Sequence, residues 1–176
     1  HQMTEIGAEP LDILLEPEGR NTTPAITISA LRVLDKFKDT NIEPILLILS
    51  SDHQIEDISK FHLAIRQSID IALDDNLVIL GVPPTFPATG YGYIKSENKL
   101  DYENTIASKV DYFAEKPDKK TAEMFIRDEK YFWNSGMFVF RASSIISEVK
   151  KFTPEILRNC EKCLRQSKKD LDFLRL

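Results

Sequence analysis

The chain has 176 residues, of which 42% are hydrophobic and 29% are charged, a balance typical of a globular protein with one substantial core. Its net charge of −5 does not suit a duplex-binding protein, and no apolar run is long enough for a transmembrane helix. We therefore expect neither nucleic acid nor a membrane among its partners, and we expect no signal peptide, which favours a cytoplasmic location.

Strands and helices alternate through the first half of the chain. The predicted order is strand, helix, strand, helix, strand, at residues 12–16, 22–38, 44–50, 58–73 and 76–81. The middle strand, Pro44-Ile-Leu-Leu-Ile-Leu-Ser50, is a continuous apolar run, as expected for a parallel strand buried on both faces. This order predicts right-handed crossovers and a doubly wound sheet.

The pattern changes in the second half. After a stiff proline loop and a segment rich in glycine and tyrosine, we predict two strands, a helix, a long strand and a helical tail, at residues 94–97, 109–114, 119–128, 131–141 and about 143–176. A polar excursion joins the first two of these strands. Because no repeat or linker interrupts the order, we predict one α/β domain over residues 1–176 with a mixed, mostly parallel sheet.

Two cysteines, Cys160 and Cys163, lie in the predicted helical tail. A structural zinc needs four ligands, and the sequence holds no second pair of cysteines. We therefore expect plain reduced thiols, which fits a reducing cytoplasm.

Four segments follow predicted strands, where ligands bind in open α/β sheets, and we expect them to converge on one pocket. The first is Glu16-Pro-Glu-Gly-Arg-Asn-Thr-Thr-Pro-Ala25, in which a glycine turn leads into a helix. Backbone N–H groups at the helix start can hold an anion, Arg20 supplies a cation, and Asn21 with the threonines supplies hydrogen bonds for a base or a ribose. The alternative is a plain N-cap made by Thr22 or Thr23, with Arg20 on the surface.

The second segment is Ser50-Ser-Asp-His53, at the end of the apolar strand. The carboxylate of Asp52 suits a magnesium ion that keeps several waters and bridges phosphates. Alternatively, Asp52 caps the following turn. For His53 we favour a structural role, because no carboxylate or nucleophile is spaced to act with it.

The third segment, Thr89-Gly-Tyr-Gly-Tyr93, combines glycines that let a ligand approach the backbone with tyrosines that can form the wall of a sugar site. A β-bulge at a sheet edge is the alternative. The fourth pairs Glu115-Lys-Pro117 with Trp133-Asn-Ser-Gly136, in which the carboxylate can accept from sugar hydroxyls and the ammonium can hold a phosphate. Here the alternatives are an exposed Glu–Lys pair and a Trp133 in the core or in a pocket wall.

Together these strings resemble one family. They occur in the order and spacing of the mannose-1-phosphate guanylyltransferases, and most closely of the bacterial type, which can be fused to a mannose-6-phosphate isomerase. The resemblance covers about residues 10–155, and the Arg-Asn-Thr string separates this branch from glucose-1-phosphate thymidylyl- and uridylyltransferases. The matching strings are Glu16-Pro-Glu-Gly-Arg-Asn-Thr-Thr-Pro-Ala25, Asp52-His53, Gly90-Tyr-Gly-Tyr-Ile94, Phe113-Ala-Glu-Lys-Pro-Asp118 and Trp133-Asn-Ser-Gly-Met-Phe138.

The resemblance implies a nucleotide-diphospho-sugar transferase-like fold and a reaction in which mannose 1-phosphate attacks the α-phosphorus of GTP, giving GDP-mannose and pyrophosphate. It implies Mg²⁺ as the cofactor, with Asp52 as its ligand and with Asp52 and Lys116 as catalytic residues. The implied nucleotide-binding residues are Glu16, Gly19, Arg20, Asn21, Thr22, Pro24 and Ser51. The implied sugar-phosphate-binding residues are Gly90, Tyr91, Gly92, Glu115, Lys116, Asn134 and Gly136.

The sequence also departs from the family pattern. Ala88, Ser51 and Thr23 stand where the family often has Glu, Ala and Ala. The family's Gly-rich phosphate loop and its second metal-binding Asp are not found, so we expect a chain truncated at both ends that is nearly inactive alone. His1, with the first Met at position 3, indicates a tag remnant or a cut within a longer chain.

Two other functions stay open at this point. One is a non-catalytic nucleotide-sugar-binding module, and the other is a nucleotidyltransferase for a different sugar 1-phosphate. The sequence is also compatible with a homo-oligomer.

Overall fold

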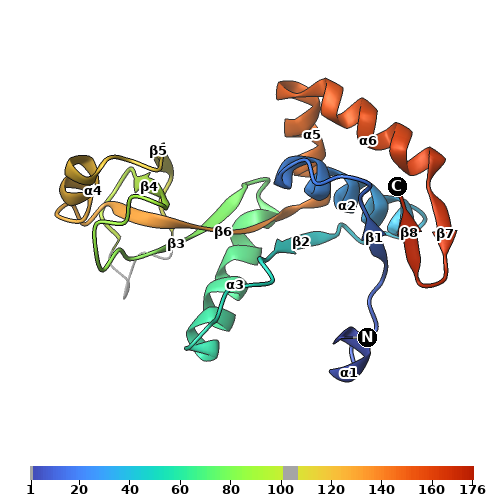
Figure 1. Cartoon of the computed structure of the whole chain (residues 1–176), viewed down its shortest axis with the longest axis horizontal. Helices are drawn as coiled ribbons and strands as arrows, with labels where there is room; N and C mark the ends of the chain where they lie inside the picture. The colour runs from blue at the N-terminus through green and yellow to red at the C-terminus, as the bar shows by residue number, and fades with distance from the viewer. Residues whose placement is uncertain (1, 101–106) are drawn as a thin grey trace. The chain divides into compact units, whose positions relative to one another are not determined.

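The computed structural model describes residues 2–100 and 107–176 (Figure 1). Residue 1 and the middle of the predicted polar excursion, 101–106, lie outside the described residues. The chain divides into two compact units: unit 1 comprises His1–Leu46 and Arg141–Leu176, and unit 2 comprises Leu47–Phe140. That residues 1–176 form a single domain stays a prediction.

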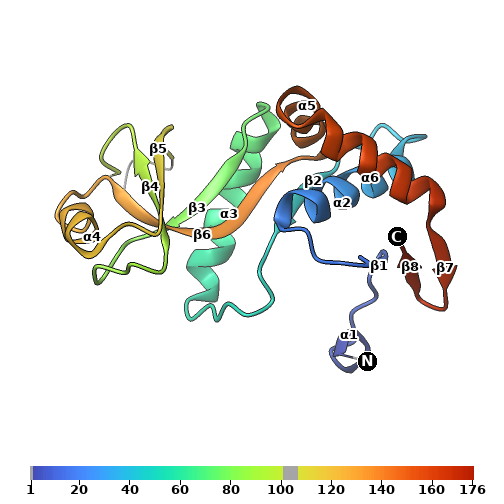
Figure 2. The same cartoon turned by 45° about the horizontal axis from the view of Figure 1, so that its top comes forward.

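Unit 1 is built around three packed helices. α2 packs against α5 and α6, which also pack against each other, and Figures 1 and 2 show α6 running alongside α2. Ile28 of α2 and Leu157 of α6 are buried, because the apolar residues of each helix recur at helical spacing on one face. A short first helix was not predicted. The helices of unit 1 are α1 (Gln2–Glu5), α2 (Thr22–Phe37), α5 (Ala142–Phe152) and α6 (Pro154–Gln166).

The end of the chain forms strands rather than the predicted helix. Unit 1 contains a three-stranded sheet of order β1-β8-β7, in which β8 runs parallel to β1 and antiparallel to β7. The helical tail ends where the Ser167 hydroxyl donates to the carbonyl of Leu164, and Leu171, with a φ of 54°, reverses the chain. The prediction of a helix to residue 176 is therefore wrong beyond 166, because pairing with a distant strand outweighs local propensity. The strands are β1 (Ile13–Leu15), β7 (Lys168–Asp170) and β8 (Phe173–Arg175).

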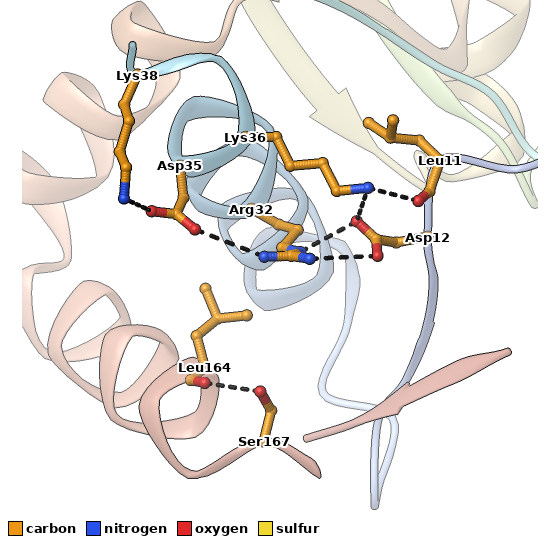
Figure 3. A network of polar contacts seen from close by, with 8 residues as sticks. All are labelled: Leu11, Asp12, Arg32, Asp35, Lys36, Lys38, Leu164 and Ser167. Carbon is orange, nitrogen blue, oxygen red and sulfur yellow. Dashed lines mark hydrogen bonds and ion pairs between the residues drawn. The ribbon is translucent and has the colours of Figure 1, made fainter. Parts of the chain in front are cut away.

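An ion-pair network ties the segment before β1 to α2 (Figure 3). Nε of Arg32 donates to Oδ2 of Asp12 at 3.0 Å, and Nζ of Lys36 lies 3.1 Å from the same oxygen. Lys36 also donates to the carbonyl of Leu11 at 2.6 Å. Burial alone would raise the pKa of Asp12, but hydrogen bonds from the two cations hold that pKa below its ordinary value. The ionised Asp12 side chain therefore holds the segment before β1 against α2.

Unit 2 contains a five-stranded sheet. The strand order is β2-β6-β4-β5, and β3 pairs with β6 beside this path. The long central strand β6 is predicted from the sequence at the same bounds, and β2 and β6 each carry the chain from one unit to the other. The strands are β2 (Ile45–Ile48), β3 (Val78–Val82), β4 (Gly92–Ser96), β5 (Val110–Glu115) and β6 (Tyr131–Arg141).

The direction and burial of the strands differ from the prediction, although the α/β class is confirmed. The pairs β3–β6, β4–β6, β4–β5 and β7–β8 are antiparallel, so a mostly parallel sheet is wrong for these pairings. A continuous apolar run indicates cover on both faces of a strand but not the direction of its neighbours. Leu47 of β2 is 38% exposed and the following Leu49 is 50% exposed, so β2 is not buried on both faces by the described residues.

Two capped helices complete unit 2. The Asp57 carboxylate accepts from the N–H of Lys60 at the start of α3, and Asp118 caps α4 in the same way. α3 packs on β3, as Figure 1 shows, and its bounds agree with the prediction. The predicted helix over 119–128 is shorter by three residues, since Phe125 ends it. The bounds are α3 (Ile58–Leu73) and α4 (Lys119–Phe125).

The core of unit 2 lies between α4 and the sheet. Tyr93 of β4 is 1% exposed and packs with Ala122 and Phe125 of α4. The Phe125 ring stacks on that of Tyr131, with ring centroids 4.1 Å apart. No helix in the described part of the chain is long and apolar enough to span a membrane.

Candidate functional site

β6 is irregular where it carries the Trp-Asn-Ser-Gly string. Gly81 of β3 pairs with Asn134, and Ile79 pairs with Phe138, so an advance of two residues along β3 matches an advance of four along β6. The two additional residues form a bulge. Gly136 adopts a φ of 69°, a conformation that side chains disfavour, and its N–H donates to Oδ1 of Asn134 at 2.9 Å.

Gly92, Glu115 and Asn134 lie close together on the sheet of unit 2, and we call this group of three residues the notch. Gly92 of β4 pairs directly with Glu115 of β5, so their side-chain positions lie on the same face. A Cβ added to Gly92 would lie 2.8 Å from Oε2 of Glu115 and 3.4 Å from Cβ of Asn134. Only a glycine leaves room for the carboxylate in this place. The notch therefore combines an acceptor carboxylate with an amide, which suits hydroxyl groups.

The aromatic residues of the same strands lie on the opposite face. Because successive strand residues alternate between faces, Tyr93 and Trp133 face the α4 core rather than the notch. The hydroxyl of Tyr93 donates to the carbonyl of Ala88 at 3.0 Å, and both residues are buried. Of the two tyrosines expected to form a sugar wall, Tyr93 is thus a core residue.

Tyr91 lies at the edge of an aromatic cluster. Its ring meets that of Trp133 edge-on at 5.2 Å, and Phe86 meets Trp133 at 4.9 Å. Tyr91 is 49% exposed and Phe86 is 51% exposed, so both rings have one free side. The sequence interpretation missed Phe86, because a single aromatic residue in a proline loop follows no periodic pattern.

Lys116 follows β5 directly, with a strained backbone. Its φ of 46° lies in the left-handed region, which costs a lysine about 1 kcal/mol. Its N–H donates to the carbonyl of Tyr91 at 3.3 Å, and its Nζ lies 3.7 Å from Oε1 of Glu115. Both side chains are mainly exposed, so the surface pair considered from the sequence is present, and it borders the notch.

The predicted nucleotide-binding segment lies in unit 1, before α2. Arg20 donates to Glu18 at 2.5 Å on the surface. Asn21, with a φ of 65°, is the N-cap residue of α2 and makes no side-chain capping bond, so capping by Thr22 or Thr23 is wrong. The helix begins one residue earlier than a cap at Thr22 requires and two residues earlier than a cap at Thr23 requires. The other predicted residues here are Glu16 and Gly19, which are exposed, and Pro24, which is half-buried.

Ser51 and Asp52 lie on an exposed turn after β2. Asp57, five residues later, is the residue that caps the next helix. Among the described residues there is no group of three or more His, Cys, Asp or Glu side chains that could hold a metal ion. Asp52 therefore offers a single accessible carboxylate.

The structure brings together part of the predicted site. The third and fourth segments meet in unit 2 through the pairing of Gly92 with Glu115 and the approach of Asn134. The first segment belongs to unit 1, and convergence of all four segments stays a prediction. A groove of about 1150 Å³ between α3, β3 and β4 is lined by none of the predicted site residues.

The comparisons with known proteins agree with the motifs. The family model for nucleotidyl transferases matches residues 2–176. The chain belongs to this family. Xanthan biosynthesis protein XanB of Xanthomonas campestris pv. campestris is 44% identical over 175 residues. Mannose-1-phosphate guanylyltransferases of Salmonella typhimurium and of Escherichia coli K12 are 43% and 39% identical. The expected nucleotidyltransferase family is thereby confirmed.

This nucleotidyl transferase chain is shorter than its relatives. Each of these three matches covers 99% of the chain but only 36% of the relative. A crystal structure named mannose-6-phosphate isomerase, from Helicobacter pylori, has a TM-score of 0.76 and 36% identity over 94% of this chain and 60% of its own. A structure named mannose-1-phosphate geranyltransferase, from Thermus thermophilus, has a TM-score of 0.78 and 28% identity over 95% and 47%.

Proposed function

We propose that the protein transfers a guanylyl group from GTP to mannose 1-phosphate, giving GDP-mannose and pyrophosphate. The observation that carries this proposal is the notch, in which a carboxylate, an amide and a nearby ammonium stand together in a chain of the nucleotidyl transferase family. The names of the curated relatives support the choice of sugar and nucleotide. Because the chain spans 36% of those relatives, the proposal concerns the full-length gene product.

The proposed reaction requires positioning of the two substrates rather than a general base. The attacking oxygen of a sugar 1-phosphate is already anionic, so catalysis consists of alignment and of neutralising charge on the phosphates. In our proposal Glu115 and Asn134 bind sugar hydroxyls, while the ammonium of Lys116 holds the sugar phosphate. The strained backbone at Lys116 supports this role, because strain persists where function requires a fixed position.

The remaining predicted residues divide between nucleotide and sugar phosphate. For the nucleotide we propose the N-terminal end of α2, where backbone N–H groups favour an anion, with Arg20 and Asn21 beside it. The other proposed nucleotide contacts are Glu16, Gly19, Thr22, Pro24 and Ser51. The other proposed sugar-phosphate contacts are Gly90, Tyr91, Gly92 and Gly136.

Asp52 is the proposed ligand of Mg²⁺. A lone, exposed carboxylate fits this ion, which keeps several waters and takes its other ligands from substrate phosphates. When bound, the ion would neutralise phosphate charge. We also propose a cytoplasmic location, and a fused isomerase and a homo-oligomer stay predictions.

Pyrophosphate release by the full-length gene product tests the function. GTP with mannose 1-phosphate should react, and UTP, dTTP and glucose 1-phosphate should react at least about tenfold more slowly. Lys116→Met should abolish most of the rate, whereas Lys120→Met, an exposed lysine in α4 of the same unit, should not. Binding without turnover would favour the non-catalytic module, and preference for another substrate pair would favour a different nucleotidyltransferase.

A further inference from the structure

Ser135 stands at the centre of the bulge in β6. The bulge removes two backbone N–H groups from the ladder between β3 and β6. The N–H of Gly136 donates to Oδ1 of Asn134, and the N–H of Met137 donates to Oγ of Ser135 at 3.1 Å. Two consecutive side chains thus satisfy the groups that the sheet leaves unpaired.

The Ser135 hydroxyl also acts as a donor. Its Oγ donates to the carbonyl of Leu80 on β3 at 2.6 Å, while it accepts from Met137. Ser135 is 9% exposed, so water does not readily replace these bonds. One hydroxyl therefore fastens the bulge to the neighbouring strand, next to Gly81, which pairs with Asn134.

The bulge also determines which atoms of the Asn134 amide can bind a ligand in the notch. The bond from Gly136 to Oδ1 of Asn134 fixes how the amide is turned and leaves Oδ1 one lone pair, whereas the amide nitrogen carries the N–H donors that a ligand can use. That nitrogen lies 3.6 Å from the position a Cβ would take on Gly92, while Oε2 of Glu115 lies 2.8 Å from it. A donor and an acceptor thus approach one point.

We propose that Ser135 is a positioning residue, which holds the bulge so that the Asn134 amide donates into the notch opposite the Glu115 carboxylate. The preferred ligand feature is then a sugar hydroxyl that accepts from Asn134 and donates to Glu115. This inference rests on the proposed function for the identity of the sugar phosphate, but the hydrogen-bonding claim concerns Ser135 and Asn134 alone.

Steady-state kinetics on the full-length gene product test the role in binding. Ser135→Ala should raise KM for mannose 1-phosphate about tenfold and leave KM for GTP within about twofold. Ser135→Thr, which keeps the hydroxyl, should recover most of the loss. Ser96→Ala is the matched control, because Ser96 is a buried serine of β4 whose hydroxyl also donates to a backbone carbonyl, that of Asn98 at 2.6 Å. Equal KM changes in both alanine variants would overturn the proposal.

Nuclear magnetic resonance gives a readout that does not need turnover. In the wild type the side-chain amide protons of Asn134 should be well dispersed and the N–H of Met137 protected from exchange; both properties should be lost in Ser135→Ala and kept in Ser96→Ala. If these signals change but the wild type never transfers a nucleotide, the positioning role stands and the proposed function fails. If they do not change, the positioning role is refuted whatever the kinetics show.

Discussion

A methyl group on Gly92 should damage function far more than stability. The added Cβ would lie 2.8 Å from Oε2 of Glu115, about 0.6 Å short of ordinary contact. The Glu115 side chain is 71% exposed, so its carboxylate can move aside, and we expect a loss of stability of at most about 1 kcal/mol. The displaced carboxylate no longer opposes Asn134, and misplacement of a binding group by this distance should cost about 10- to 100-fold in kcat/KM for the sugar phosphate.

Two measurements on Gly92→Ala check this separation. Thermal unfolding followed by circular dichroism should show a melting temperature close to that of the wild type. Assays of pyrophosphate release should show a lower kcat/KM when mannose 1-phosphate is varied and little change in kcat/KM when GTP is varied. A variant that melts well below the wild type, or that keeps full kcat/KM, would refute the reasoning. In the first case the notch would be rigid, and in the second Glu115 would not contact the substrate.

Three further outcomes follow from the packing and the charges. Gly81→Ala presents the same 2.8 Å approach, but to Cβ of the buried Phe132, so it should cost about 1–3 kcal/mol in urea unfolding. Asp12→Asn should cost about 1 kcal/mol at pH 7 in the same experiment. Because the folded pKa of Asp12 lies below its ordinary 3.8, this contribution is present above pH 3.8 and is lost as the pH falls through the folded pKa, so the stabilities of wild type and variant should converge below that pKa. Burial raises the pKa of Cys160 from 9.0 to about 11, so at pH 8 its thiolate fraction should be about 100-fold below that of an ordinary thiol, and mass spectrometry after brief iodoacetamide treatment should find it unmodified.

Elements with strong local signals were predicted at their observed bounds. The helix over 58–73 has apolar residues at helical spacing, and the strand over 131–141 is rich in aromatic residues, so local pattern and final structure agree. The tail after residue 166 was not predicted, because its strands are held by pairing with residues 13–15, over 150 positions away in sequence. The antiparallel pairings among β3, β4, β5 and β6 were also not predicted, since the residues of a strand carry little information about the direction of its neighbour.

The site was predictable as a set of residues but not as a geometry. The motif strings identified Gly92, Glu115 and Asn134, and strand pairing brings them together. The alternation of side chains along a strand then places Gly92 and Tyr93 on opposite faces, although the sequence interpretation assigned the glycines and tyrosines of this segment to one sugar site. The role of Ser135 depends on a register shift between β3 and β6, and a register shift has no signature in a single sequence.

Two residues with a strained backbone lie in segments that the sequence predicts to bind a ligand. Among the described non-glycine residues, four have a positive φ. Asp75 follows the end of α3, where this conformation is common, and Leu171 makes the β7–β8 turn. The other two, Asn21 and Lys116, lie in segments singled out from the sequence for binding phosphates. A turn that served only to connect elements would be more stable with glycine, so the lysine at φ 46° agrees with the proposal that its ammonium binds the sugar phosphate.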